Sequence, residues 1–295
     1  MQPADFLSAV FFYLKVGENL NQNWIVENLN NAFSTWNGKL GELWGLVTTG
    51  PQTFKGGAVW SVMQTLHNGM VGIGYALVVL FFAISLCKNT MNFHELKRPE
   101  AAIHYLIRFV AAKALVGYGM DIMLNVFSIC NGIVTDMADS MGGISEAMVS
   151  LPAEMQTAIE NVGFLASIPL WLVTILGSLF ITVLSFVMIL TVYGRFFRLY
   201  MYTALAPLPL AAFAGESTQS VGISFLKSYV GVCLEGAVIV LACVIYSAFV
   251  STPTVASGEA TTIVWSYLAE TVFNMLVLVG LIKGSDRIIH EMMGL

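Results

Sequence analysis

The chain has 295 residues, of which 57% are hydrophobic and only 11% are charged, and its formal net charge is −5. Soluble domains carry about 25% charged residues, so this composition excludes an ordinary soluble enzyme or binding domain and indicates a protein with several membrane spans. The acidic balance, with no basic cluster, also argues against a surface that binds nucleic acid. We therefore expect an all-α polytopic membrane bundle with no large soluble domain.

Residues 1–57 are predicted to lie outside the cytoplasm as an amphipathic helix followed by a second short helix. Leu7, Val10, Phe11 and Leu14 recur at i, i+3, i+4 and i+7, which places them on one helical face. The segment also contains three tryptophans typical of a membrane–water interface: Trp24, Trp36 and Trp44. A helix lying in the interface and a helical cap packed on the bundle fit this pattern equally well.

Between residues 58 and 283, apolar blocks alternate with polar segments and predict a transmembrane bundle of about five helices. The spans are expected near residues 66–87, 101–131, 164–193, 224–250 and 262–283, with one broken segment at 196–215. Residues 284–295 form the predicted cytoplasmic tail. In the first span, three glycines predict a small-residue face for close helix contact: Gly69, Gly72 and Gly74.

The broken segment contains an uncharged run of 17 residues that begins at Leu199. A spanning helix needs about 20 residues, and Pro207 and Pro209 interrupt this run. Broken backbone at membrane depth is tolerated only where protein or a water-filled cavity satisfies the freed polar groups. The run therefore either kinks inside the bundle or enters the membrane and returns.

The orientation follows from the basic residues, which favour the cytoplasmic side of a membrane. Loop 88–100 holds three Lys or Arg residues, whereas loop 132–163 holds none. If the broken segment is re-entrant, Lys227 and the tail that contains Lys283 and Arg287 all lie inside. We therefore predict a re-entrant segment, an N-terminus outside and a C-terminus inside.

Ionisable residues inside the expected spans are the first candidates for function: Lys113, Asp121, Glu235 and Glu270. They either line a polar channel or relay protons, or they pair inside the bundle or across subunits, as Lys113 could with Glu235. Arg195 and Arg198 are expected one turn apart at the cytoplasmic end of the third span. Together with Lys227 they are interpreted as topology anchors or as a docking site for a partner ATPase or an anionic lipid.

No catalytic or ligand motif is found in the sequence. The four histidines are scattered, and HExxH, GxSxG and Walker-type patterns are absent. The cysteines form no CxxC pair and lie in apolar segments, so we expect small buried hydrophobic residues: Cys87, Cys130, Cys233 and Cys243. The sequence therefore predicts no catalytic residue, no metal and no cofactor.

Residues 195–241 resemble the core of the polytopic channel subunit of type IV secretion and conjugation machines, the TrbL-like conjugal transfer family, in the compact form of Gram-positive mobile elements. The resemblance rests on a basic helix end, an Ala-Pro step in a short apolar segment, a Gly-centred loop and an aromatic–Leu–Lys step: Arg195, Arg198, Ala206, Pro207, Gly215, Phe225, Leu226 and Lys227. Pro209 belongs to the same broken segment.

The resemblance implies a non-catalytic scaffold or channel subunit of a conjugative DNA transfer apparatus, with several passes through the inner (cytoplasmic) membrane. Implied partners are the secretion ATPases, the coupling ATPase, single-span subunits, further copies of the chain and membrane lipid, with DNA or protein cargo passing only transiently. A secondary transporter or ion channel that uses buried carboxylates remains the alternative. An intramembrane enzyme has little support, because no clustered catalytic set is present.

Overall fold

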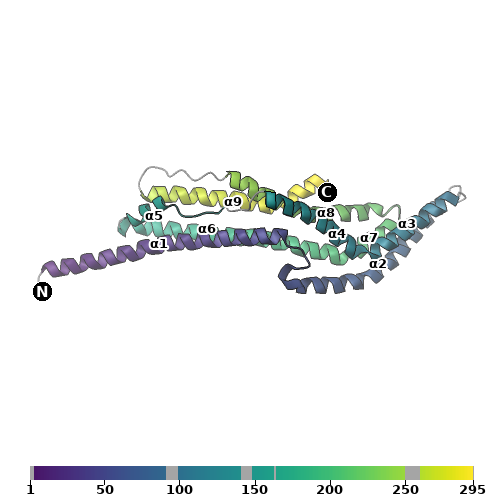
Figure 1. Ribbon diagram of the computed structural model, residues 1–295, viewed down its shortest axis with the longest axis horizontal. Coiled ribbons are helices and arrows are strands. Elements are labelled where there is room, and N and C mark those ends of the chain that lie inside the picture. Colours follow the sequence, from purple (N-terminus) through teal and green to yellow (C-terminus); the bar gives the residue numbers. More distant parts are fainter. Residues whose placement is uncertain (1–2, 91–98, 141–147, 163, 250–259, 295) are drawn as a thin grey trace. The chain divides into compact units, whose positions relative to one another are not determined.

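The computed structural model describes residues 3–90, 99–140, 148–162, 164–249 and 260–294, which form helices joined by turns and contain no strand (Figure 1). Within these ranges, four helices are long and apolar enough to cross a membrane, and a bent helix pair raises the number to five. The predicted all-α membrane bundle is therefore confirmed.

The elements follow one another as α1 (Pro3–Thr48), η1 (Phe54–Gly57), α2 (Ala58–Thr90), α3 (Pro99–Gly117), α4 (Gly119–Ser140), α5 (Ala153–Glu160), α6 (Phe164–Leu205), α7 (Pro207–Ala211), η3 (Ala212–Ala214), α8 (Gln219–Phe249) and α9 (Ala260–Met293). They form two compact units. The first unit comprises Met1–Gly45, Met141–Thr191 and Leu241–Lys283, and the second comprises Leu46–Ser140, Val192–Val240 and Gly284–Leu295.

In the first unit, α1 packs as a bundle helix along one continuous apolar face. Its buried residues recur every three or four positions: Ile25, Leu29, Phe33, Trp36, Leu40 and Leu43. Trp24 lies against Trp171 of α6 with 5.5 Å between ring centroids, and Asn28 Nδ2 donates to Ser178 Oγ at 3.2 Å. Residues 1–57 were expected either to lie in the membrane interface or to pack on the bundle, and the structure therefore favours packing on the bundle.

The predicted division of this region into two helices was wrong, because α1 is a single helix of 46 residues. The side chains of Leu7, Val10, Phe11 and Leu14 lie outside the described part.

The predicted second span is two helices rather than one. α3 and α4 meet at Tyr118 with a bend of 72°. Gly117 and Gly119 flank the bend, and a Cβ at these positions would lie 2.7 Å from Tyr75 Oη and 3.2 Å from Leu210 Cδ1, respectively. The glycines thus let the bend pack closely against α2 and α7, a requirement that the apolar composition of residues 101–131 did not reveal.

The predicted C-terminal boundary of the third span, at residue 193, was also wrong. α6 does not stop at Arg195 but continues as one helix to Leu205, so the break falls at Ala206 rather than at residue 196. α7 begins with Pro207, which suits the first turn of a helix because its missing N–H is not needed there. α7 packs against α2 and α3.

His67 of α2 compensates for the backbone group that Pro207 leaves without a donor. In a regular helix the Thr203 carbonyl would accept from the N–H of residue 207, which proline lacks. His67 is 1% exposed, and its Nδ1 lies 2.7 Å from the Thr203 carbonyl oxygen. Because a carbonyl can only accept, this nitrogen carries the hydrogen and donates it.

Among the three glycines of the predicted small-residue face, only Gly74 makes a close helix contact. A Cβ at Gly74 would lie 2.9 Å from Val116 Cγ1 and 3.0 Å from the Pro207 carbonyl oxygen, whereas nothing lies within 4 Å of such an atom at Gly69 or Gly72. Of these three glycines, Gly74 alone contributes to the close approach of α2, α3 and α7.

The pairing of His67 with the Thr203 carbonyl predicts a non-additive pair of substitutions. His67→Leu in the wild-type chain leaves a buried carbonyl without a donor, which we expect to cost about 1–3 kcal/mol of unfolding free energy. In a Pro207→Ala background the residue-207 N–H can serve that carbonyl, so the same substitution should cost less. Unfolding of the four purified variants in detergent measures the difference. An equal cost in both backgrounds would refute the assignment.

Candidate functional site

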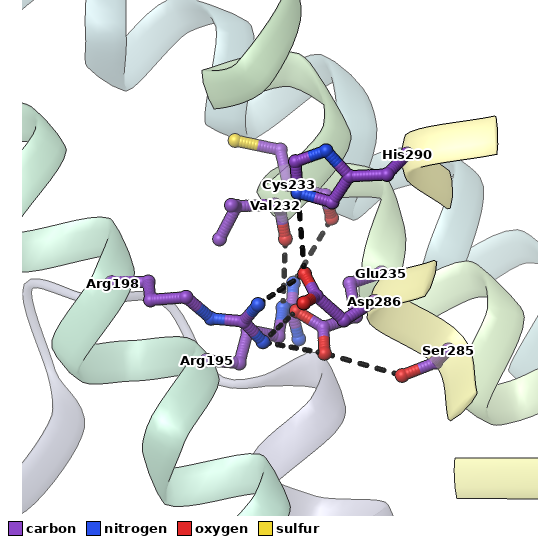
Figure 2. Close-up of polar contacts among 8 residues, drawn as sticks. All are labelled: Arg195, Arg198, Val232, Cys233, Glu235, Ser285, Asp286 and His290. Carbon is purple, nitrogen blue, oxygen red and sulfur yellow. Dashed lines mark hydrogen bonds and ion pairs between the residues drawn. The ribbon is translucent and has the colours of Figure 1, made fainter. Parts of the chain in front are cut away.

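A cluster of charged side chains joins α6, α8 and α9 in the second unit (Figure 2). Its centre is Glu235 of α8, which is only 1% exposed. Arg198 of α6 donates from Nη2 to both carboxylate oxygens of Glu235 at 2.7 Å, and Ser285 Oγ of α9 donates to Glu235 Oε1 at 3.2 Å. A carboxylate withdrawn from water in this way requires a partner of opposite charge and further donors, and both are present.

Arg198 also bridges to the last helix. Its Nη1 pairs with Asp286 Oδ1 of α9, as Figure 2 shows, and His290 Nε2 lies 3.6 Å from the same carboxylate oxygen. Asp286 and His290 are both less than half exposed on their side chains, at 44% and 43%. One guanidinium therefore ties α6 simultaneously to α8 and α9.

Arg195 is completely buried and is satisfied by main-chain carbonyls. Its Nε donates to the Val232 oxygen at 3.2 Å and its Nη2 to the Cys233 oxygen at 3.1 Å, both on α8. Its Nη1 donates to the Val47 oxygen at 3.4 Å, in the last turn of α1. The last carbonyls of a helix have no partner inside it and carry partial negative charge, so a cation stabilises them.

Gly236 makes room for this arrangement. A Cβ at Gly236 would lie 2.7 Å from Arg195 Nη1 and 2.8 Å from its Cζ. Any larger residue would hold the guanidinium away from the α8 backbone. The glycine therefore lets the charge of Arg195 rest directly on the carbonyls of the neighbouring helix.

Other residues of the second unit complete the end of α1. The Thr48 carbonyl accepts from Asn131 Nδ2 of α4 at 3.2 Å, and the Leu46 carbonyl accepts from the Thr49 N–H at 3.2 Å. Just beyond, Phe54 stacks on Phe196 of α6 with 4.0 Å between centroids. The α1 end thus receives its donors from α4 and α6, and α1 itself has no basic residue in its last turn.

The remaining predicted charges do not join the cluster. Lys113, Asp121, Lys227 and Glu270 are exposed. The suggested pair of Lys113 with Glu235 is wrong, because Glu235 pairs with Arg198. Arg195 has no exposed surface for docking a partner. Cys87 is also exposed, against the expectation that all four cysteines are buried.

The residues of the broken segment serve close packing. Ala206, Pro207 and Gly215 are buried, and Pro209 is partly exposed. A Cβ at Gly215 would lie 2.7 Å from Thr218 Oγ1 and 3.1 Å from the Phe81 carbonyl oxygen of α2. The turn between η3 and α8 therefore lies directly against the backbone of α2.

Six contributors were not singled out by the sequence: His67, Asn131, Gly236, Ser285, Asp286 and His290. The only available signal was the adjacency of Gly236 to Glu235, which places an opening in the helix surface beside a buried acid. The others come from distant parts of the chain. Among the described residues, no group of three or more His, Cys, Asp or Glu residues could hold a metal ion.

The contact between Arg198 and Glu235 also constrains the path of the chain. Their side chains meet at 2.7 Å, so the chain that leaves Arg198 returns to the same level of the second unit by Glu235. The intervening stretch contains the end of α6, α7, η3 and the start of α8. It is a helical hairpin whose tip is the turn near Gly215.

The pairing predicts a strong asymmetry between single and double substitutions. Arg198→Met leaves Glu235 buried without its cation, which we expect to cost about 3–5 kcal/mol of unfolding free energy, whereas adding Glu235→Leu should restore most of the loss. Membrane abundance and unfolding in detergent are the readouts. The exposed pair of Arg287 with Glu291, at 2.8 Å, is the matched control, and its removal should cost at most about 1 kcal/mol. A double variant no more stable than Arg198→Met would contradict the pairing.

Comparison with known families identifies the chain. A family model described as TrbL/VirB6 plasmid conjugal transfer like protein matches residues 36–207, more than half of the chain. The match includes Arg195, Arg198, Ala206 and Pro207, and it extends into residues 36–57. No curated protein and no solved structure matches the chain. The chain belongs to the TrbL/VirB6 plasmid conjugal transfer-like family and is a multi-pass membrane component of a type IV secretion or conjugal transfer system.

Proposed function

We propose that this protein is a non-catalytic scaffold that borders the translocation channel of a conjugative apparatus in the cytoplasmic membrane. In this role it is present in several copies. It binds the secretion ATPases, the coupling ATPase and single-span subunits, and it contacts the cargo only transiently. The family membership supplies the setting, and the geometry of the second unit supports the structural role.

The observation that carries the proposal is the internal use of the buried charges. Glu235 accepts from Arg198 and Ser285, and Arg195 donates to the backbone carbonyls of Val47, Val232 and Cys233. A carboxylate that relays protons or carries an ion needs access to water or a partner that exchanges. A carboxylate held by a guanidinium and a hydroxyl instead fixes the positions of three helices, which is the property that a scaffold requires.

The exposed surface of α6 supports association with lipid or with neighbouring subunits. Large exposed apolar residues recur every three or four positions from 168 to 190 and again from 197 to 205: Ile168, Leu172, Leu176, Leu179, Val183, Phe186, Leu190, Phe197, Met201 and Leu205. With 42 residues, α6 is about 63 Å long, roughly twice the thickness of a bilayer core. A face of this length suits contact with the membrane along one part and with other subunits along the rest.

The proposed topology has the N-terminus outside and the C-terminus inside. The hairpin between Arg198 and Glu235 returns to the level from which it leaves, so this stretch begins and ends on the same side. Asp286 of α9 belongs to the same cluster, so the basic end of the α6 apolar block and the polar end of α9 lie together. Under the positive-inside bias both ends belong to the cytoplasm.

A reporter fusion tests this topology. A fluorescent protein that folds only in the cytoplasm should be active when fused after Leu295, and alkaline phosphatase at the same site should be inactive. The same two reporters placed before Met1 should give the opposite result. Phosphatase activity at the C-terminus would overturn the proposed orientation and, with it, the re-entrant assignment.

One observation favours the alternative function of transporter or ion channel. Two broken helices meet in the second unit, because Gly119 beside the Tyr118 bend faces Leu210 of α7. Discontinuous helices that meet near the middle of the membrane are a common feature of transporter binding sites. The exposed Lys113 and Asp121 flank the same bend in sequence, but nothing brings them to the Arg198 cluster.

Conjugative DNA transfer by a variant that lacks the Arg198–Glu235 ion pair distinguishes the two functions. Donor cells that lack the gene should recover conjugation when they express wild-type protein or the Arg198→Met, Glu235→Leu double variant, because a scaffold needs the helix positions and not the charges. Co-purification of each form with the secretion ATPases checks assembly. If the double variant accumulates and assembles but transfers no DNA, and wild-type protein alone carries ions into liposomes, the transporter function is correct.

A further inference from the structure

In the first unit, the outward surfaces of α1 and α6 differ in character. Every exposed residue of α6 from Ile168 to Leu190 is apolar, over a length of about 33 Å, which is close to the thickness of a bilayer core. The exposed residues of α1 after Trp24 are instead polar or glycine. We call them the α1 polar face: Glu27, Asn30, Asn31, Ser34, Gly38, Gly41 and Gly45. They recur every three or four positions and therefore lie along one side of the helix.

The α1 polar face lies at the same membrane depth as the apolar surface of α6. Asn28 Nδ2 donates to Ser178 Oγ at 3.2 Å. Farther along both helices, Lys39 Nζ lies 5.9 Å from the centre of the Phe186 ring, so the two helices run side by side in the same direction. Hydrocarbon cannot hydrogen-bond to amides, hydroxyls or carboxylates, and these groups are costly to place in it. The α1 polar face consequently needs water or another polar surface against it.

A segment that is neither helix nor strand lies against α1, at residues 148–151 just before α5. Asn37 Nδ2 donates to the Val149 carbonyl at 2.8 Å, and Asn37 Oδ1 accepts from the Val149 N–H at 2.9 Å. Tyr267 Oη of α9 donates to the Ser150 carbonyl at 3.0 Å. Because Asn37 lies between the two α6 contacts of α1, this segment is also at membrane depth. Such backbone occurs there only where protein buries it or where it lines a water-filled cavity, and the exposure of Ser150 agrees with the second case.

An open cavity of about 510 Å³ lies between residues 148–151 and part of the α1 polar face. Asn30, Ser34 and Gly38 line it on one side and Ser150 on the other, and none of its lining residues is charged. A single water molecule occupies about 30 Å³, so the cavity has room for a hydrated surface. A charged polymer is held at a surface mainly by groups of opposite charge. A surface of amides, hydroxyls and glycine carries water but does not retain such a polymer.

We propose that the α1 polar face and residues 148–151 form a water-filled groove at membrane depth, and that this groove borders the path of the translocated polymer. The polymer that suits it is charged, extended and hydrated, because the cavity offers hydrogen bonds and no fixed charge. The exposed apolar surface of α6 from 168 to 190 lies against lipid. The inference rests on the proposed scaffold function and names the surface of this chain that faces the cargo.

The accessibility of single cysteines in donor cells tests the groove. The full chain is expressed with the complete apparatus in a Cys87→Ser background, because the other three native cysteines are buried. The probe is methanethiosulfonate ethylsulfonate, a charged reagent that reacts with thiolates. Asn31→Cys and Ser34→Cys should react at least about tenfold faster than Leu179→Cys and Val183→Cys, since a thiol ionises readily only where water reaches it. All four positions are exposed in the structure, so the comparison reports their surroundings and not their burial.

Two further measurements accompany the labelling. After denaturation in detergent, the four variants should react at the same rate, which shows that each thiol is intact. DNA transfer is measured before and after treatment of the cells. The anionic group that the reagent adds to Ser34→Cys should lower the transfer frequency, because it narrows and charges the groove. Treatment should leave transfer by Val183→Cys unchanged.

Equal reaction rates on α1 and α6 would overturn the inference. Labelling of the α1 positions only in cells that lack the other subunits would also overturn it, because a partner protein would then cover this face. Rapid labelling of Ser34→Cys without any loss of transfer would contradict the assignment to the translocation path. The scaffold function is judged separately, by co-purification of unlabelled wild-type protein with the secretion ATPases, which none of these labelling results affects.

Discussion

A guanidinium that is withdrawn from water needs hydrogen-bond acceptors around it. In the second unit, the buried Arg195 obtains these acceptors from two neighbouring helices. The end of α1 supplies the Val47 carbonyl, and α8 supplies two carbonyls that become accessible because residue 236 is glycine. Each charge-assisted hydrogen bond of this kind contributes about 1.5–3 kcal/mol. The same contacts position Arg198, one turn later, for its carboxylate partners on α8 and α9. Without Arg195, both the helix end and the ion-pair cluster would lose their support.

The two interruptions of the helices are satisfied by neighbouring elements. Pro207 removes a donor from the Thr203 carbonyl, and His67 of α2 replaces it. The Gly-Tyr-Gly bend between α3 and α4 packs against α2 and α7, where a Cβ on either glycine would require Tyr75 or Leu210 to shift. Since a membrane interior offers no water to unpaired backbone groups, such compensation is what allows broken helices to persist there.

These features together fit an assembly component better than a solute carrier. The buried charges hold helices to one another, while apolar side chains are displayed outward along α6. A subunit of a conjugal transfer machine must keep a defined shape while neighbours bind to it.

The sequence by itself determined the helical membrane class, the approximate apolar blocks and the family, because each depends on composition or on local order along the chain. It also identified the Pro-broken segment, since proline acts on its own turn. Only the tertiary structure decided that Glu235 pairs with Arg198 rather than Lys113, that α6 continues past Arg195, and that residues 101–131 bend at Tyr118. Pairing depends on which helices meet and in what register, and apolar segments of similar composition do not encode this in any local pattern. For the same reason the partner of His67 could not be predicted from the sequence, because it is a backbone carbonyl 136 residues away.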